Sequence, residues 1–286
     1  MNGCGFFLPI SDDHRMIRAM NANEKAAALR QRKGGIPICA LTAYDFPTAR
    51  LLDQAGIDVL LVGDSLGMVV LGFPDTTHVT LAHMRHHTAA VARARPDALI
   101  LADLPIHSYD TPEKALASAR QLMEEGADAV KLEGGSEQWE KIHAITTAGI
   151  AVIGHIGMLP QRVNELGGYR KQGRTKEAAT TLFEDARALE NAGVCAIVLE
   201  SIIPAVAVEI TAAVAIPTIG IGCGESTCDG EVAVVTDLLG SFPWFVPPFA
   251  KPEADLATQI VHAAQAYRRR VQGDVTEANE SQTLRG

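Results

Sequence analysis

The sequence predicts a (β/α)8 barrel, in which eight parallel strands close into a ring and the connecting helices pack around it. Short apolar runs alternate with helix-like segments along most of the 286 residues, and this alternation implies parallel strands joined by right-handed crossovers. The length suits one such barrel. Several apolar runs also end in an acidic residue, and a closed barrel, unlike an open sheet, brings the carboxyl ends of all its strands to one rim.

The order of elements follows from the apolar runs and the residues that flank them. A first helix at residues 21–33 is rich in Ala, Glu, Lys and Arg, and it precedes the first strand. Strands are expected at residues 36–41, 57–63, 98–102, 129–132, 151–155, 196–199, 216–221 and 243–246. Helices are expected between them at residues 46–55, 80–95, 111–125, 136–148, 175–192 and 204–214, followed by a last helix at 252–272. Thr111 and Pro112 mark a helix start, and Gly126 a helix end.

No linker or low-complexity segment divides the chain, so we expect one catalytic domain over residues 21–272. Residues 1–20 are expected to be irregular, and residues 273–286 to form a flexible tail, because chain ends that contain little apolar sequence are seldom held in place.

Composition excludes several classes of function. The formal charge is −9 and no stripe of Lys and Arg is present, which argues against a nucleic-acid partner. No apolar run reaches the length of a membrane span, and the apolar segment at residues 5–10 is too short for a signal peptide. The five cysteines show no paired framework, so we expect a reducing, cytoplasmic location. Cys223 and Cys228 lack a second pair, and the sequence therefore favours neither a redox nor a zinc function for them.

Four acidic residues follow four of the predicted strands: Asp64, Asp103, Glu133 and Glu200. Carboxylates gathered in one cavity repel one another unless a cation neutralises them, and oxygen ligands suit Mg²⁺. No set of His and Cys residues at the strand ends indicates zinc. A helix cap or a surface ion pair explains any one acid equally well, but the fourfold repetition favours a shared site.

Three further residues near these strand ends are candidate contacts for a substrate. Lys131 lies two positions before Glu133, so both side chains are on the same face of the strand. A buried lysine needs a partner, and we expect it to pair with a substrate carboxylate or with an acid of the rim. The alternative is a purely structural ion pair with Glu133. Ser65 is either a substrate contact or a capping serine, and both roles are compatible. His155 ends the fifth strand and either binds an oxygen of the substrate or is a packed histidine.

A family resemblance rests on segments that occur in a fixed order along the chain: Leu-Thr-Ala-Tyr-Asp at 41–45, Val-Gly-Asp-Ser-Leu-Gly-Met at 62–68, Ala-Asp-Leu-Pro at 102–105, Val-Lys-Leu-Glu-Gly-Gly at 130–135, Gly-His-Ile-Gly at 154–157, Val-Leu-Glu at 198–200 and Ile-Gly-Ile-Gly at 219–222. In these segments, from about residue 25 to residue 270, the chain resembles the ketopantoate hydroxymethyltransferase family. The resemblance implies a barrel of the phosphoenolpyruvate mutase and isocitrate lyase superfamily. It also implies transfer of a hydroxymethyl group from the co-substrate 5,10-methylenetetrahydrofolate to 3-methyl-2-oxobutanoate, giving 2-dehydropantoate for pantothenate and coenzyme A.

The resemblance also implies roles for individual residues. Asp64, Asp103 and Glu133 match the metal positions for one Mg²⁺ per subunit, with Asp64 and Asp103 also facing the substrate. Glu200 matches the general base that removes the C3 proton of the 2-oxo acid and leaves a Mg-stabilised enolate. Ser65 matches a substrate-contacting hydroxyl. The family further implies a homo-oligomer, commonly a homodecamer.

Two other functions remain open at this point. One is a folate-independent, Mg²⁺-dependent lyase or mutase of the same superfamily that acts on a 2-oxo acid. The other is a non-catalytic protein that binds 2-oxo acids or serves in assembly. A transferase requires methylenetetrahydrofolate, whereas a lyase or mutase acts without it. A transferase also exchanges the C3 hydrogen of 3-methyl-2-oxobutanoate, whereas a non-catalytic binding protein does not.

Overall fold

A computed structural model describes residues 20–272 except 164 and 166, and within this part of the chain eight parallel strands form a closed barrel. The strands neighbour one another in sequence order, and β8 pairs with β1 to close the ring. The strands are β1 (Ile38–Thr42), β2 (Val59–Val62), β3 (Leu99–Asp103), β4 (Ala129–Glu133), β5 (Ala151–Gly157), β6 (Ala196–Glu200), β7 (Thr218–Ile221) and β8 (Gly230–Ala233). The predicted fold class is therefore confirmed. The irregular segment and the tail expected at the two ends fall at residues 1–19 and 273–286, outside the described residues, apart from residue 20.

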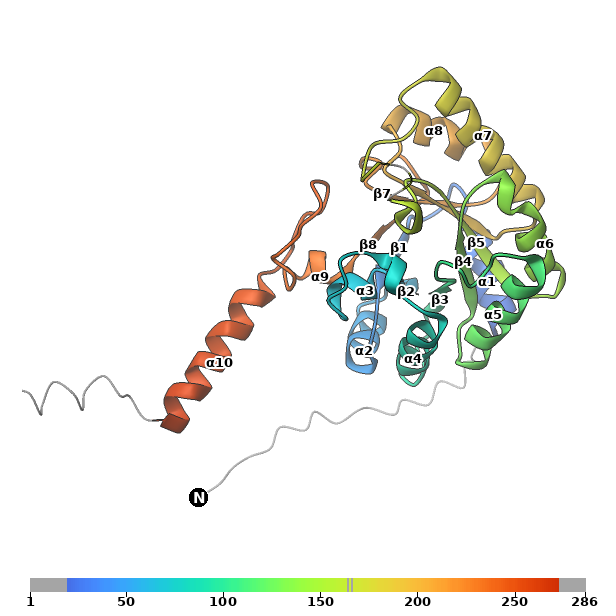
Figure 1. The fold of residues 1–286 in the computed structure, drawn as a ribbon. Coiled ribbons are helices and arrows are strands. Elements are labelled where there is room, and N and C mark those ends of the chain that lie inside the picture. The colour runs from blue at the N-terminus through green and yellow to red at the C-terminus, as the bar shows by residue number, and fades with distance from the viewer. Residues whose placement is uncertain (1–19, 164, 166, 273–286) are drawn as a thin grey trace, which may run out of the picture.

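Helices cover the outside of the barrel (Figure 1). The helices of the described residues are α1 (Ala22–Arg30), α2 (Phe46–Gln54), α3 (Leu66–Val69), α4 (Leu81–Ala92), α5 (Pro112–Glu124), α6 (Trp139–Thr147), α7 (Lys176–Asn191), α8 (Pro204–Ala213), α9 (Val235–Leu238) and α10 (Leu256–Gln272), with short 3-10 turns η1 (Thr76–His78), η2 (Ser136–Gln138) and η3 (Pro160–Arg162). Thr111 caps α5 by accepting a hydrogen bond from the backbone N–H of Lys114, and Gly126 follows the helix with a φ of +100°. The predicted boundaries of this helix are confirmed.

Alternation along the strands divides the apolar side chains into two layers. Leu60, Val62 and Ile100 face outward and pack in the layer beneath the helices. Val59 and Leu61, at the alternate positions, fill the inside of the barrel together with the inward residues of the other strands. Because both faces of each strand are covered, the strands are continuously apolar, as the sequence suggested.

The eighth strand is not where the sequence predicted it. Residues 243–246 do not form a strand: they lie in the connection before α10, where Trp244 is 80% exposed. Pro243, Pro247 and Pro248 have no N–H to donate to a ladder, whereas the short segment Gly230–Ala233 pairs with both β7 and β1. The prediction followed aromatic and apolar composition, but pairing at this position depends on close approach of the backbone.

Gly230 makes that close approach possible. A Cβ atom at position 230 would lie 2.4 Å from the carbonyl oxygen of Ile38, the residue it pairs with on β1. We expect Gly230→Ala to lower the free energy of unfolding by about 2–3 kcal/mol, because the seam that closes the barrel must move apart. Urea unfolding measures the change, and Glu231→Ala, an exposed position in the same strand, is the control and should change it by less than about 0.5 kcal/mol. Equal stability of the two variants would show that the seam tolerates a side chain.

The predicted last helix is present as α10, but it does not lie against the barrel wall. It extends away from the other elements (Figure 1), and none of its residues is buried. Its exposed side chains include Ile260, Val261, Tyr267 and Val271. Within the described residues, no helix is both long enough and apolar enough to cross a bilayer.

Candidate active site

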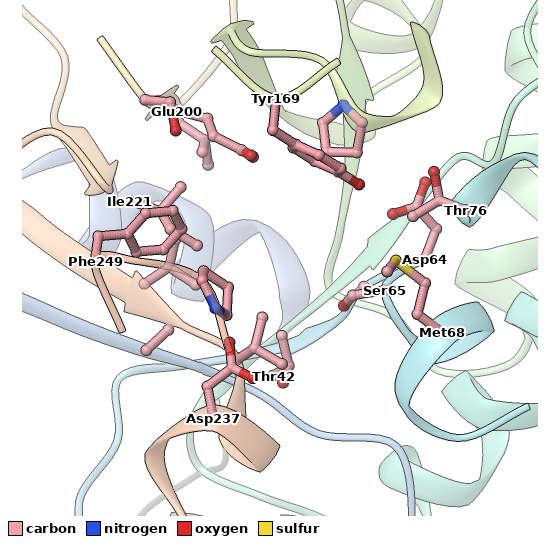
Figure 2. Close-up of a pocket in the computed structure, with 18 of the residues that line it drawn as sticks. Thr42, Asp64, Ser65, Met68, Thr76, Tyr169, Glu200, Ile221, Asp237 and Phe249 are labelled. Carbon is pink, nitrogen blue, oxygen red and sulfur yellow. The ribbon is translucent and has the colours of Figure 1, made fainter. Parts of the chain in front are cut away.

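The carboxyl ends of the eight strands form the rim of the barrel. A cavity of about 660 Å³ opens at this rim. Asp64, Asp103, Glu133 and Glu200, the four acids predicted to converge, all line it, as do Ser65, Lys131 and His155. Figure 2 shows Asp64 and Ser65 on one side of the cavity and Glu200 on another. The structure thus brings together every site residue predicted from the sequence.

Strand alternation explains why these side chains point inward. Ala129 belongs to the apolar layer inside the barrel, and Lys131 and Glu133 follow it at intervals of two residues. The same interval carries Ile153 to His155 on β5, and Val198 to Glu200 on β6. These three strands, β4, β5 and β6, are therefore apolar in the middle of the barrel and polar at the rim.

Asp64 and Asp103 lie against each other. The backbone N–H of Asp64 donates to Asp103 Oδ2 at 3.0 Å, and the two residues are 4% and 2% exposed. Burial raises the pKa of Asp64 well above its usual value, and repulsion by Asp103 and Glu133 raises it further. Burial also raises the pKa of Asp103, although Lys131 opposes the shift. A bound cation would relieve both effects.

Lys131 is the buried cation of this cluster. Its Nζ lies 3.2 Å from Asp103 Oδ1 and 3.9 Å from Glu133 Oε1. Burial by itself lowers the pKa of this ammonium group, but the attraction of Asp103 and Glu133 outweighs burial and raises it, so Lys131 stays charged. Of the alternatives raised above, pairing with a rim acid is realised, and Asp103 is the nearer partner.

Glu133 is held by several neighbours. Its Oε2 accepts the backbone N–H of Gln161 at 3.1 Å, and its Oε1 lies 3.5 Å from His155 Nδ1. Burial raises the pKa of Glu133, but the contacts with His155 and Lys131 outweigh it and lower the pKa. Within the described residues, no three Asp, Glu, His or Cys side chains meet closely enough to hold a metal ion by themselves. Asp64, Asp103 and Glu133 nevertheless line one cavity, and their role as the three metal ligands stays a prediction.

His155 connects Glu133 to Glu200. Its Nε2 lies 3.3 Å from Glu200 Oε2, and the imidazole is 2% exposed. Burial and Lys131 lower the pKa of His155, but the contacts with Glu133 and Glu200 raise it to about 9 overall. The contact with Glu200 is an ion pair and not a hydrogen bond, because Nε2 has no hydrogen-bond partner in the described structure. The Glu200 side chain is 13% exposed and reaches the open part of the cavity.

Ser65 does not cap the helix that follows it. It occupies the N-cap position of α3 without a side-chain capping hydrogen bond. Its Oγ instead lies 2.9 Å from the hydroxyl of Tyr44, whose pKa is raised by burial, so that the phenol stays neutral. The capping alternative is therefore wrong, and the hydroxyl is held at the cavity wall by Tyr44.

The cluster suits a hard divalent cation that also binds solvent and substrate. Asp103 Oδ1 and Glu133 Oε1 are buried and make no hydrogen bond in the described structure. Asp64 and Asp103 supply oxygen atoms side by side, and Mg²⁺ is commonly bound by one or two carboxylates together with substrate oxygens and water. The donor set thus fits Mg²⁺ better than zinc, which prefers Cys and His.

Sequence analysis missed two contributors to the site. Gln161, in η3, donates from Nε2 to Asp64 Oδ2 at 2.8 Å and accepts from the hydroxyl of Tyr109. Asp237, in α9, lines the cavity, and burial raises its pKa to about 6. Neither residue lies at the end of a strand, so the pattern of strand-end acids contains no signal for them.

An eight-stranded barrel with buried carboxylates, a lysine and a histidine gathered at its rim defines an enzyme of the (β/α)8 class. The comparisons with known proteins identify the family. The chain belongs to the ketopantoate hydroxymethyltransferase family, whose sequence profile matches residues 24–275.

Curated relatives share about half of their residues with this chain. A protein of Ignicoccus hospitalis, named 3-methyl-2-oxobutanoate hydroxymethyltransferase, is 51% identical over 244 residues, which cover 85% of this chain and 92% of the relative. A protein of Dehalococcoides mccartyi with the same name is 53% identical over 250 residues, covering 86% of this chain and 88% of the relative.

Solved structures with the same fold are more distant in sequence. Phosphonopyruvate hydrolase in complex with oxalate and Mg²⁺ superposes with a TM-score of 0.59 at 16% identity, covering 92% of this chain and 91% of the other. The 2,3-dimethylmalate lyase, a member of the PEP mutase/isocitrate lyase superfamily, gives a TM-score of 0.56 at 18% identity, covering 89% of this chain and 91% of the other. At these identities the likeness concerns the fold.

Proposed function

We propose that this enzyme transfers a hydroxymethyl group from 5,10-methylenetetrahydrofolate to 3-methyl-2-oxobutanoate and forms 2-dehydropantoate, a step of pantothenate biosynthesis. The observation that carries the proposal is the 51% identity to a relative of that name across 85% of the chain. The buried acids, lysine and histidine at the rim supply the groups that such a reaction requires.

The metal of this reaction is Mg²⁺, with Asp64 and Asp103 as the residues that would hold it. When bound, Mg²⁺ supplies Lewis acidity, which withdraws electrons from the 2-oxo acid and makes its C3 proton easier to remove. Glu133 supports the site through Gln161 and His155. The Mg²⁺ complex of the phosphonopyruvate hydrolase, which has the same fold, is consistent with this choice of ion.

Glu200 is the general base in this proposal. Its carboxylate reaches the cavity from β6, and its Oε2 lies 3.3 Å from His155 Nε2. That contact orients the carboxylate, while its partial exposure leaves it free to take a proton from C3. A carboxylate alone is a weak base toward a C–H bond, so most of the barrier reduction must come from electrostatic stabilisation by the surrounding groups.

The other residues bind and orient the two substrates. The Lys131 ammonium offers charge to the carboxylate of the 2-oxo acid, and the Ser65 hydroxyl, held by Tyr44, offers a hydrogen bond. Arg170, Lys171 and Arg174 line the cavity beyond them, where the anionic tail of a folate would find positive charge. Asp237 and the aromatic side chains Phe242, Phe245 and Phe249 also line the cavity, and such a surface suits a flat, hydrogen-bonding pterin.

We also propose that the chain works in the cytoplasm as a homo-oligomer, with a homodecamer as the expected form. The four cysteines of the described residues are all free thiols, which is usual in a reducing compartment. The apolar side chains on α10, which are exposed in the single chain, would be covered by a second copy. Sedimentation velocity measures the assembly directly.

A product assay tests the function and separates it from its alternative. We expect 2-dehydropantoate to form from 3-methyl-2-oxobutanoate only when Mg²⁺ and methylenetetrahydrofolate are both present. Cleavage or rearrangement of a 2-oxo acid without folate would instead identify a lyase or mutase of the superfamily.

A further inference from the structure

The β7–β8 connection at residues 222–229 holds two cysteines that the proposed reaction does not use. The backbone turns sharply here, with φ values of +64° at Gly222, +101° at Gly224 and +56° at Ser226. Such positive values are uncommon for a residue with a side chain such as Ser226. These turns bring Cys223 and Cys228 back toward each other across the loop.

The two cysteines lie next to each other. Both side chains pack beside Gly220 on β7, and the acidity of each thiol responds to the presence of the other. A Cβ atom at position 220 would be 3.0 Å from Cys228 Sγ and 3.8 Å from Cys223 Cβ. The missing side chain at Gly220 thus leaves the room in which the cysteines meet. Sequence spacing had favoured no joint role, because it could not show this contact.

The two cysteines differ in exposure and in acidity. Cys223 is 2% exposed, whereas Cys228 is only partly buried. The neighbouring Cys223 lowers the pKa of Cys228 to about 6 against the opposing effect of burial, and the threonines at 227, 218 and 211 lower it further. The same pairing, together with burial, raises the pKa of Cys223. Cys228 is therefore the more exposed and the more acidic of the two thiols, and Cys223 is the protected one.

We propose that Cys223 and Cys228 form a redox-sensitive pair, which hydrogen peroxide converts to a disulfide that loosens the rim at Glu200. In the first step the Cys228 thiolate attacks one peroxide oxygen and the O–O bond breaks. This leaves a sulfenic acid, and the released hydroxide takes up a proton to become water. In the second step the sulfur of Cys223 attacks the Cys228 sulfur. The S–S bond forms, the S–O bond breaks, and the departing hydroxide leaves as water with the proton of Cys223. Two thiols are oxidised and one peroxide is reduced.

The loop and the last residue of β7 before it make three contacts near Glu200, so strain from a disulfide in the loop would reach the rim. The thiol of Cys223 donates to the carbonyl oxygen of Leu199 at 3.1 Å, immediately before Glu200, and the disulfide removes this donor. The carbonyl of Ile221 accepts the backbone N–H of Ser201 at 2.8 Å, immediately after Glu200. The carbonyl of Gly222 accepts a hydrogen bond from Lys171, which lines the cavity.

Mass spectrometry of the peroxide-treated full-length protein tests the pair. We expect a loss of two hydrogens, a peptide crosslinked between positions 223 and 228, and reversal by dithiothreitol. Cys223→Ser should stop at the sulfenic acid, and Cys228→Ser should form neither product. Cys39→Ser is the matched control, because Cys39 is exposed but lies on β1, and its replacement should leave the crosslink unchanged. In the untreated protein, iodoacetamide should label Cys228 about tenfold faster than Cys39.

Amide hydrogen exchange of the same samples tests the effect on the rim. We expect the Ser201 N–H to exchange at least about tenfold faster in the oxidised protein, and to return to its original rate after reduction. Failure to form the 223–228 crosslink would overturn the pair, and an unchanged Ser201 exchange rate would overturn the link to Glu200. Neither readout depends on turnover, so the outcome is separate from that of the proposed function.

Discussion

Glu200→Gln should slow hydrogen–deuterium exchange at C3 of 3-methyl-2-oxobutanoate by about 1000-fold, within the range associated with loss of a general base. Glutamine has nearly the same shape and keeps a polar group beside His155 Nε2. It cannot accept the C3 proton at neutral pH. NMR in heavy water measures the exchange in the presence of Mg²⁺ and without folate, which isolates proton removal from transfer of the one-carbon unit.

The matched control for this variant is Glu209→Gln, an exposed position on α8. It should exchange at the wild-type rate. We also expect calorimetry to find unchanged affinity of Glu200→Gln for the 2-oxo acid, because Lys131 and Ser65 remain in place. Exchange at the wild-type rate in Glu200→Gln would mean that another group is the base.

Asp64→Asn is expected to raise the Mg²⁺ concentration needed for half-maximal exchange by about 100-fold. The substitution removes one of two adjacent negative charges but keeps the shape of the side chain, and asparagine can still accept the hydrogen bond from Gln161 Nε2. Titration of the exchange rate with Mg²⁺, after removal of bound metal with a chelator, measures this effect. Asp97→Asn, at an exposed position before β3, is the control.

The stability of the same variant distinguishes loss of metal binding from misfolding. Burial and the neighbouring acids raise the pKa of Asp64, so its negative charge opposes folding when no metal is bound. We therefore expect the free energy of unfolding of metal-free Asp64→Asn to equal that of the metal-free wild type or to exceed it by up to about 1 kcal/mol. A large loss of stability together with an unchanged Mg²⁺ requirement would show that Asp64 has a structural role.

The barrel was predictable because its signals are local. Leu60, Leu61 and Val62 form an apolar run because both faces of β2 are covered, and Thr111 and Gly126 bound α5 through caps that involve only nearby residues. The eighth strand lacked such a signal. Gly230 fits this strand because its backbone approaches Ile38, a residue far away in the chain, too closely for a side chain. Local composition does not show such an approach, so the strand was predicted at the more apolar segment 243–246.

The candidate site divides in the same way. The positions of Lys131, Glu133 and Glu200 follow from counting along strands, since every second side chain points into the barrel and the carboxyl ends of all strands share one rim. The sequence was therefore sufficient for the fold class, for the acids that converge and for the family. Partners within the site depend on distances between side chains from separate segments.

Folding alone establishes the contacts of Gln161 with Asp64, of Tyr44 with Ser65 and of Cys223 with Cys228. It also determines that α10 stands apart from the barrel instead of covering it. The physical reason is that a periodic pattern specifies which way a side chain points within its own element. Which group it meets there depends on how the elements pack against one another, and packing is a property of the whole chain.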